Sequence, residues 1–132
     1  MSLDTTRLIR GYLVSTSAIT ILVPSSDIKV GWVRTADQFP CITINQAGGM
    51  DVGYLGYNTS SAGSHLREET SRIQLDIYSK NSRLETFQIA DEIVPVMISG
   101  GCRKESDIDD YNDESGLYRK IQIYSIIKHY DD

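Results

Sequence analysis

The chain has 132 residues, of which 40% are hydrophobic, and its 13 basic and 18 acidic residues give a formal net charge of −5. This length predicts a single domain, 1–132, that buries roughly two thirds of its unfolded surface. The acidic balance argues against a surface that neutralises nucleic-acid phosphates, which requires clustered basic residues. Two cysteines, Cys41 and Cys102, are too few for a disulfide framework, so we expect both to be reduced and buried.

The N-terminal region shows no signal-peptide pattern, and the apolar run 17–23 is too short to cross a bilayer. We therefore expect an intracellular protein that does not enter a membrane. Residues 3–14 predict a first helix, with Asp4 as its N-cap. The run 17–23 is typical of either a strand or a short helical turn before Pro24.

Two strands are predicted next, at 28–33 and 39–45, because apolar residues alternate there. The segment 46–66 then places five glycines among Asn, Ser and Thr, which is typical of a long flexible loop or an extended hairpin arm. Segments of this length usually have a function or are disordered. Its apolar side chains Tyr54, Leu55 and Tyr57 are candidates for contact with a partner.

Residues 71–97 change periodicity halfway. Ile73, Leu75 and Ile77 alternate as in a half-buried strand, and an apolar stripe at helical spacing follows from residue 84 to residue 97. Ser82 with Glu85 three residues later fits a capping box. Pro95 is expected to kink or stop this helix.

The C-terminal part predicts a weak strand at 102–108, a turn at 109–116 and a long strand at 117–130. We expect one face of the long strand to meet the core through Leu117, Ile121, Ile123 and Ile127. The other face carries Tyr118, Tyr124, Ile126 and Tyr130. The order of elements predicts an α+β fold: a mainly antiparallel sheet with two helices packed on one face, and a long loop or hairpin arm between the second and third strands.

The six carboxylates of 105–114 are a second candidate site: Glu105, Asp107, Asp109, Asp110, Asp113 and Glu114. Because like charges repel, we expect a solvated turn that lines a DNA path or docks on a basic partner. A calcium loop is the alternative, but Tyr111 stands at a ligand position and Asn112 at the turn glycine. A plain solvated turn remains open as well.

No motif for catalysis, a cofactor or a metal is present. The glycine-rich segment lacks the Lys-Ser or Lys-Thr of a P-loop and the spacing of a dinucleotide fingerprint. His65 and His129 have no metal-ligand spacing, although a Cys–His pair formed in space stays open. We therefore expect no catalytic, cofactor-binding or metal-binding residues and no enzyme activity.

The tyrosines Tyr118, Tyr124 and Tyr130 share the predicted outer face of the last strand. Aromatic residues are enriched at protein interfaces, so this face predicts cover by another chain. A tyrosine-bearing solvent face, or cover by the segment 46–66, is the alternative that the sequence leaves open.

Several strings resemble the tail-completion or tail-terminator proteins of long-tailed phages and prophages. They are "SAITILVPSSDIKVGWV" at 17–33, "FPCITI" at 39–44, "SRIQLDIYSKNSRLETFQIADEIVPVM" at 71–97 and "LYRKIQIYSII" at 117–127. The resemblance covers nearly the whole chain, apart from the glycine-rich and acidic segments.

The resemblance implies a structural role without enzyme activity. Such proteins form a ring, usually a homohexamer, that stops polymerisation of the tail tube and joins the tail to the head. The implied partners are other copies of the chain, the tail-tube protein and the head–tail connector proteins. The implied location is the virion tail, and before that the cytoplasm of a bacterial or archaeal host. A head–tail connector or neck adaptor, or a small ligand-binding or enzymatic domain that uses 46–66 as a lid, are the alternatives.

Overall fold

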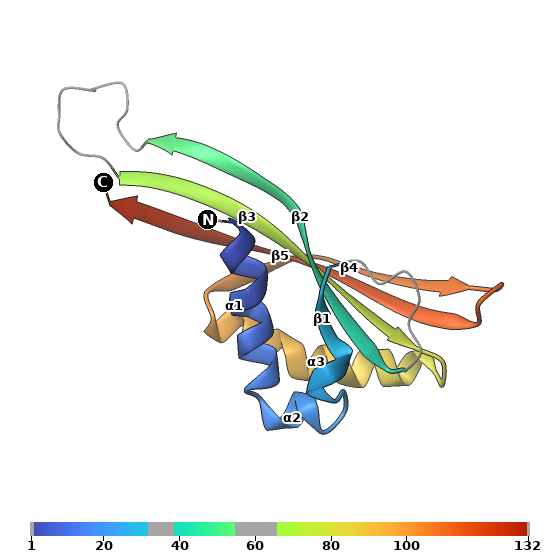
Figure 1. Ribbon diagram of the computed structural model, residues 1–132. Helices are drawn as coiled ribbons and strands as arrows, with labels where there is room; N and C mark the ends of the chain where they lie inside the picture. The colour runs from blue at the N-terminus through green and yellow to red at the C-terminus, as the bar shows by residue number, and fades with distance from the viewer. Residues whose placement is uncertain (1, 32–38, 55–65, 132) are drawn as a thin grey trace.

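The computed structural model describes residues 2–31, 39–54 and 66–131. Its helices are α1 (Ser2–Val14), α2 (Ser17–Thr20), the 3-10 turn η1 (Ser25–Asp27) and α3 (Arg83–Ser99). Its strands are β1 (Ile28–Val30), β2 (Cys41–Tyr54), β3 (Leu66–Ser79), β4 (Cys102–Asn112) and β5 (Leu117–Asp131). These elements form one five-stranded sheet with the helices on one side of it (Figure 1).

The strand order is β1-β2-β3-β5-β4. The short β1 pairs with β2 in parallel, and the other three pairings are antiparallel. The predicted α+β class is therefore confirmed. Beyond the helices, β2, β3 and β5 continue side by side as a three-stranded arm (Figure 1).

The segment 46–54, predicted as part of a loop or hairpin arm, belongs to β2, so the hairpin arm is the correct alternative there. It pairs with β3, which begins at Leu66, five residues before the predicted strand. Register shifts follow Gln46 and Asp51, so the ladder tolerates the glycines by bulging. Leu55 and Tyr57 lie outside the described residues.

The junction between β3 and α3 matches the predicted cap. The backbone N–H of Glu85 donates to Ser82 Oγ at 3.1 Å, which satisfies one of the free donors at the helix start. The Glu85 carboxylate accepts from Ser79 Oγ and from Asn81, which closes the short connection. Pro95 does not end the helix, which continues to Ser99, because Ile93 and Met97 on either side are buried against the sheet.

Two other boundaries differ from expectation. The first helix begins at Ser2, so Asp4 lies inside it and is not its N-cap. The run 17–23 begins with the short helix α2, so the helical turn is the correct one of its two predicted alternatives. Strand β4 continues to Asn112, so the acidic segment is mostly strand and the turn is confined to 113–116.

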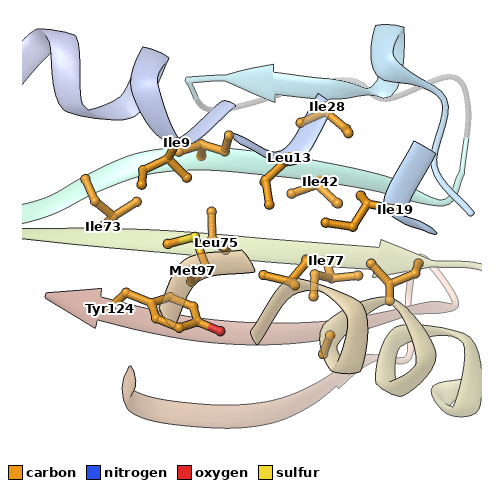
Figure 2. Packing of buried hydrophobic residues seen from close by; sticks show 14 of the residues in the cluster. Ile9, Leu13, Ile19, Ile28, Ile42, Ile73, Leu75, Ile77, Met97 and Tyr124 are labelled. Carbon is orange, nitrogen blue, oxygen red and sulfur yellow. The ribbon is translucent and has the colours of Figure 1, made fainter. Parts of the chain in front are cut away.

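The core lies between the sheet and the helices. Figure 2 shows the isoleucines and leucines of α1, β2 and β3 converging with Met97 of α3. Tyr124 also points into this cluster and is fully buried. The predicted faces of β5 are therefore exchanged: Tyr124 lies on the helix side, and Ile121 and Ile123 lie on the other. The cause is the register, which sets Tyr124 opposite the core residue Ile73.

Candidate functional site

The face of the sheet opposite α1 and α3 carries the main candidate site, and we call it the helix-free face. The register places four rows of residues across β2, β3, β5 and β4 on it. Two of these rows run through its centre, Thr43–Asp76–Ile121–Ile108 and Asn45–Gln74–Ile123–Ser106. The β2–β3 half is polar, and the β5–β4 half presents isoleucines.

An ion pair lies at the centre of this face. Arg119 Nη2 donates to Asp76 Oδ2 at 3.0 Å, and the Asp76 side chain is completely buried. Gln74 Nε2 also donates to Asp76, at 3.0 Å to Oδ1 and 3.3 Å to Oδ2. The Arg119 guanidinium lies 5.6 Å from the centre of the Tyr78 ring. The carboxylate is therefore held by a cation and an amide, as a buried charge requires.

Two neighbouring groups are affected by this environment. Burial, followed by the charge of Asp76, raises the pKa of Tyr78, although Arg119 opposes the shift. Burial also raises the pKa of the Cys41 thiol to about 11, with a further contribution from Asp27. Both groups are therefore neutral at ordinary pH, and the Cys41 thiol lacks the lowered pKa of a reactive cysteine.

Three buried polar atoms on this face have no hydrogen-bond partner within the described part of the chain: Thr43 Oγ1, Asn45 Nδ2 and Arg119 Nε. Each such atom costs about 1–3 kcal/mol relative to a satisfied one. Burial of the polar half of the helix-free face therefore contributes less to the stability of the fold than it would if these atoms were paired.

Sequence reasoning missed Asp76 and Arg119. Each residue alternates with apolar neighbours in its strand, which is the pattern of an ordinary solvent-facing position. Their opposite charges on two strands that could pair were the available signal. That signal becomes informative only when the register is known.

The predicted acidic segment is divided by the structure. Lys120 Nζ contacts Asp107 Oδ1 at 2.7 Å and Asp109 Oδ1 at 3.2 Å, and Lys104 Nζ contacts Asp107 Oδ2 at 3.1 Å. Burial disfavours the charge of Asp107, but the hydrogen bonds from Lys120 and Lys104 hold its pKa below the usual range. Asp107 and Asp109 are exposed, as a solvated segment requires, but both form ion pairs with Lys120, which offsets the repulsion between the like charges.

The remaining carboxylates of the segment have separate surroundings. Glu105 contacts Arg72 Nε at 3.2 Å. Asp110 accepts a hydrogen bond from the N–H of Tyr111, and Asp113 and Glu114 are exposed in the turn. The described residues contain no group of three or more His, Cys, Asp or Glu side chains that could hold a metal ion.

The predicted tyrosines are also separated. Tyr118 is half-buried, and its ring centre lies 4.7 Å from that of Tyr111 near the tip of the β4–β5 hairpin. Tyr54 and Tyr130 are both Cα partners of Arg67, so the register brings them to one row of the arm. Tyr124, in the core, cannot contribute to an outer surface.

A groove of about 450 Å³ opens between the C-terminal ends of α1 and α3. Its lining comprises Tyr12, Ser15, Thr16, Pro95, Val96, Ser99 and Gly100. An active site usually combines a nucleophile with an acid or base. This lining offers hydroxyl groups but no carboxylate, histidine, cysteine or lysine, so its residues do not form such a set.

Within the described ranges, no helix is long and apolar enough to span a bilayer. No protein-family model and no curated protein match the chain. Among solved structures, it matches a chain of the "Virion of native gene transfer agent (GTA) particle" with a TM-score of 0.75. The match covers 92% of each chain at 4% sequence identity, so what the two chains share is the fold.

Proposed function

We propose that this chain is a structural protein of a phage-like particle. In our proposal it forms a homo-oligomeric ring, of six copies, at the head-proximal end of the tail tube. The ring ends tube polymerisation and provides the surface to which the filled head attaches. The observation that carries the proposal is the fold shared with a virion chain over 92% of both chains.

The two faces of β5 support an assembly role. Tyr124 fills the core on one face, while Ile121 and Ile123 are only half-buried on the other, next to Ile108, which is 50% exposed. A strand that is apolar on both faces is typical of a sheet with cover on both sides. The described helices cover one side only, so a neighbouring chain is the cover that a ring provides.

The net charge of −5 fits a particle through which DNA passes. Exposed acidic groups repel phosphates, so DNA slides past them without being retained. The exposed Asp110, Asp113 and Glu114 are our candidates for the DNA path or for a basic partner. Tyr54, Tyr118 and Tyr130 remain candidates for contact with another chain, and the role is structural, with no enzyme activity.

In this proposal the partners are further copies of the chain, the tail-tube protein and the head–tail connector proteins. The chain assembles in the cytoplasm of its bacterial or archaeal host and ends in the virion tail. The proposal requires no cofactor and no base-specific contact with DNA.

The test is an assembly experiment with tubes polymerised from the tail-tube protein encoded next to this chain. Electron microscopy is expected to show a ring at one end of each tube, and adding the chain during polymerisation is expected to shorten the tubes. A chain that binds isolated heads but not tubes is a connector instead. A chain that binds neither contradicts a role in head–tail joining.

A further inference from the structure

The outer side of α3 is an exposed stripe that combines apolar and acidic residues. Its buried side faces the core through Ile89, Ala90, Ile93 and Met97. At 100° per residue, the opposite side carries Leu84, Gln88, Asp91, Pro95 and Ile98, which we call the outer α3 stripe. Leu84 is 63% exposed and Ile98 is 59% exposed, so the stripe presents a large apolar side chain to solvent near each end of the helix.

The one charge of this stripe, on Asp91, has no ion-pair partner within the described part of the chain. Asp91 and its neighbour Glu92 are both exposed, and neither forms a salt bridge there. Asp91 lies midway between Leu84 and Ile98, about 10 Å from each at 1.5 Å of rise per residue. The stripe is therefore an acidic centre with an apolar side chain at each end.

The helix-free face offers the opposite pattern on β5 and β4. Arg103 is exposed and has no ion pair among the described residues. The register places it in one row with Ser125 of β5 and Arg72 of β3. Ile123 and Ile121 follow along β5, about 7 and 13 Å from Ser125 at 3.3 Å per residue. Arg72 is already paired with Glu105, so the surface presents the charge of Arg103 at one end, followed by isoleucines.

These spacings match. Suppose that Asp91 of one copy meets Arg103 of another. Leu84 or Ile98, about 10 Å from Asp91 along α3, then lies between Ile123 and Ile121, which are about 7 and 13 Å along β5 from the row of Arg103. The two surfaces lie on opposite sides of the molecule, since α3 and the helix-free face are separated by the sheet and core (Figure 1). They therefore cannot meet within one chain, but they can meet between two copies.

We infer that the outer α3 stripe of one copy packs on the helix-free face of the next, with Asp91 against Arg103. Such a contact joins two different surfaces, so it is heterologous and closes into a ring when the rotation between copies allows it. This inference rests on the proposed function in one respect: it takes the contact to be the one between neighbouring subunits of the ring. Opposite charges set the register of the contact, and the apolar side chains supply its buried area.

Charge reversal tests the contact. We expect Asp91→Lys and Arg103→Glu each to raise the dissociation constant of self-association at least about ten-fold, measured by sedimentation equilibrium. The double variant in one chain, or a mixture of the two single variants, is expected to restore association, because each copy again meets the opposite charge. Arg7→Glu is the matched control for Arg103→Glu, since it makes the same charge change at an exposed position outside both surfaces.

Circular dichroism confirms folding of each variant, so that lost association is not lost structure. Single variants that associate like the wild type overturn the contact, and so does a wild-type chain that stays monomeric in solution and on tube ends. If Asp91→Lys caps tubes as well as the wild type, the ring stands and this contact is wrong. If the charge pattern governs association but tubes are never capped, the contact stands and the proposed function fails.

Discussion

The ion pair between Asp76 and Arg119 provides a direct test of how the helix-free face is stabilised. Asp76 is completely buried, whereas 29% of the Arg119 side chain is exposed. Asp76→Asn removes the negative charge, and Arg119→Met removes the positive one, both with little change in shape. We expect Arg119→Met to destabilise more, because it leaves a buried carboxylate with only the Gln74 amide as a side-chain donor.

The magnitudes follow from the geometry. At 3.0 Å, two unit charges attract by about 5.5 kcal/mol at an effective dielectric constant of about 20. Lost hydration offsets part of this, and removing one partner of a buried pair costs about 3–5 kcal/mol. We expect about 4 kcal/mol for Arg119→Met. For Asp76→Asn we expect about 2 kcal/mol, because the partly exposed guanidinium regains water.

Urea denaturation followed by circular dichroism measures these free energies, with the exposed Arg7→Met as control. The double variant is expected to cost about 2–3 kcal/mol less than the sum of the single variants, because it leaves no unpaired charge. Additive effects, or equal effects of the two single variants, would show that burial of Asp76 does not control the energetics of this pair.

Three further substitutions test individual side chains. Thr43→Val removes a buried hydroxyl without a partner, so we expect about 1 kcal/mol of stabilisation and a thermal midpoint higher by a few degrees; a lower midpoint contradicts this. The pKa of the Cys41 thiol is raised from 9.0 to about 11, so the unfolded chain releases this proton first and the unfolding free energy falls as the pH rises through that window. Cys41→Ala should reduce this slope, and an unchanged slope refutes the assignment. Ser82→Ala removes the acceptor for the Glu85 N–H and should cost about 1 kcal/mol by denaturation, clearly more than Ser99→Ala at the far end of α3.

The sequence predicted correctly those elements that depend on residues close together in the chain. The alternation of Ile73, Leu75 and Ile77 and the cap at Ser82 depend on residues a few positions apart, and the structure confirms both. The glycines of 46–54 left a loop and a hairpin arm equally open in the sequence, and the structure has the arm. Pairing with β3 sets their conformation, and that long-range interaction overrides local preference.

The sequence prediction assigned the two faces of β5 the wrong way round, for a related reason. Alternation separates Ile121 and Ile123 from Gln122 and Tyr124, but it does not say which set meets the helices. Isoleucines are the more apolar set, so they were assigned to the core. The structure instead buries the polar-tipped set, because Tyr124 Oη donates to Gln122 Oε1 at 2.8 Å and both side chains are thereby satisfied.

The edges of the sheet limit how copies could pack in the proposed ring. Six of the eleven residues of β4 are charged, and a register shift interrupts its pairing between Lys104 and Ser106. At the other edge β1 has only three residues, and β2 carries two register shifts of its own. Charges, short strands and bulges are the features that prevent sheets from joining edge to edge. Edge-to-edge pairing is therefore disfavoured at both edges, so in the proposed ring the faces of the sheet and of α3 are the surfaces available to a second copy. The exposed isoleucine on β4 and the exposed leucine and isoleucine on α3 lie on those two faces, so packing there would bury apolar surface that the isolated chain leaves in water.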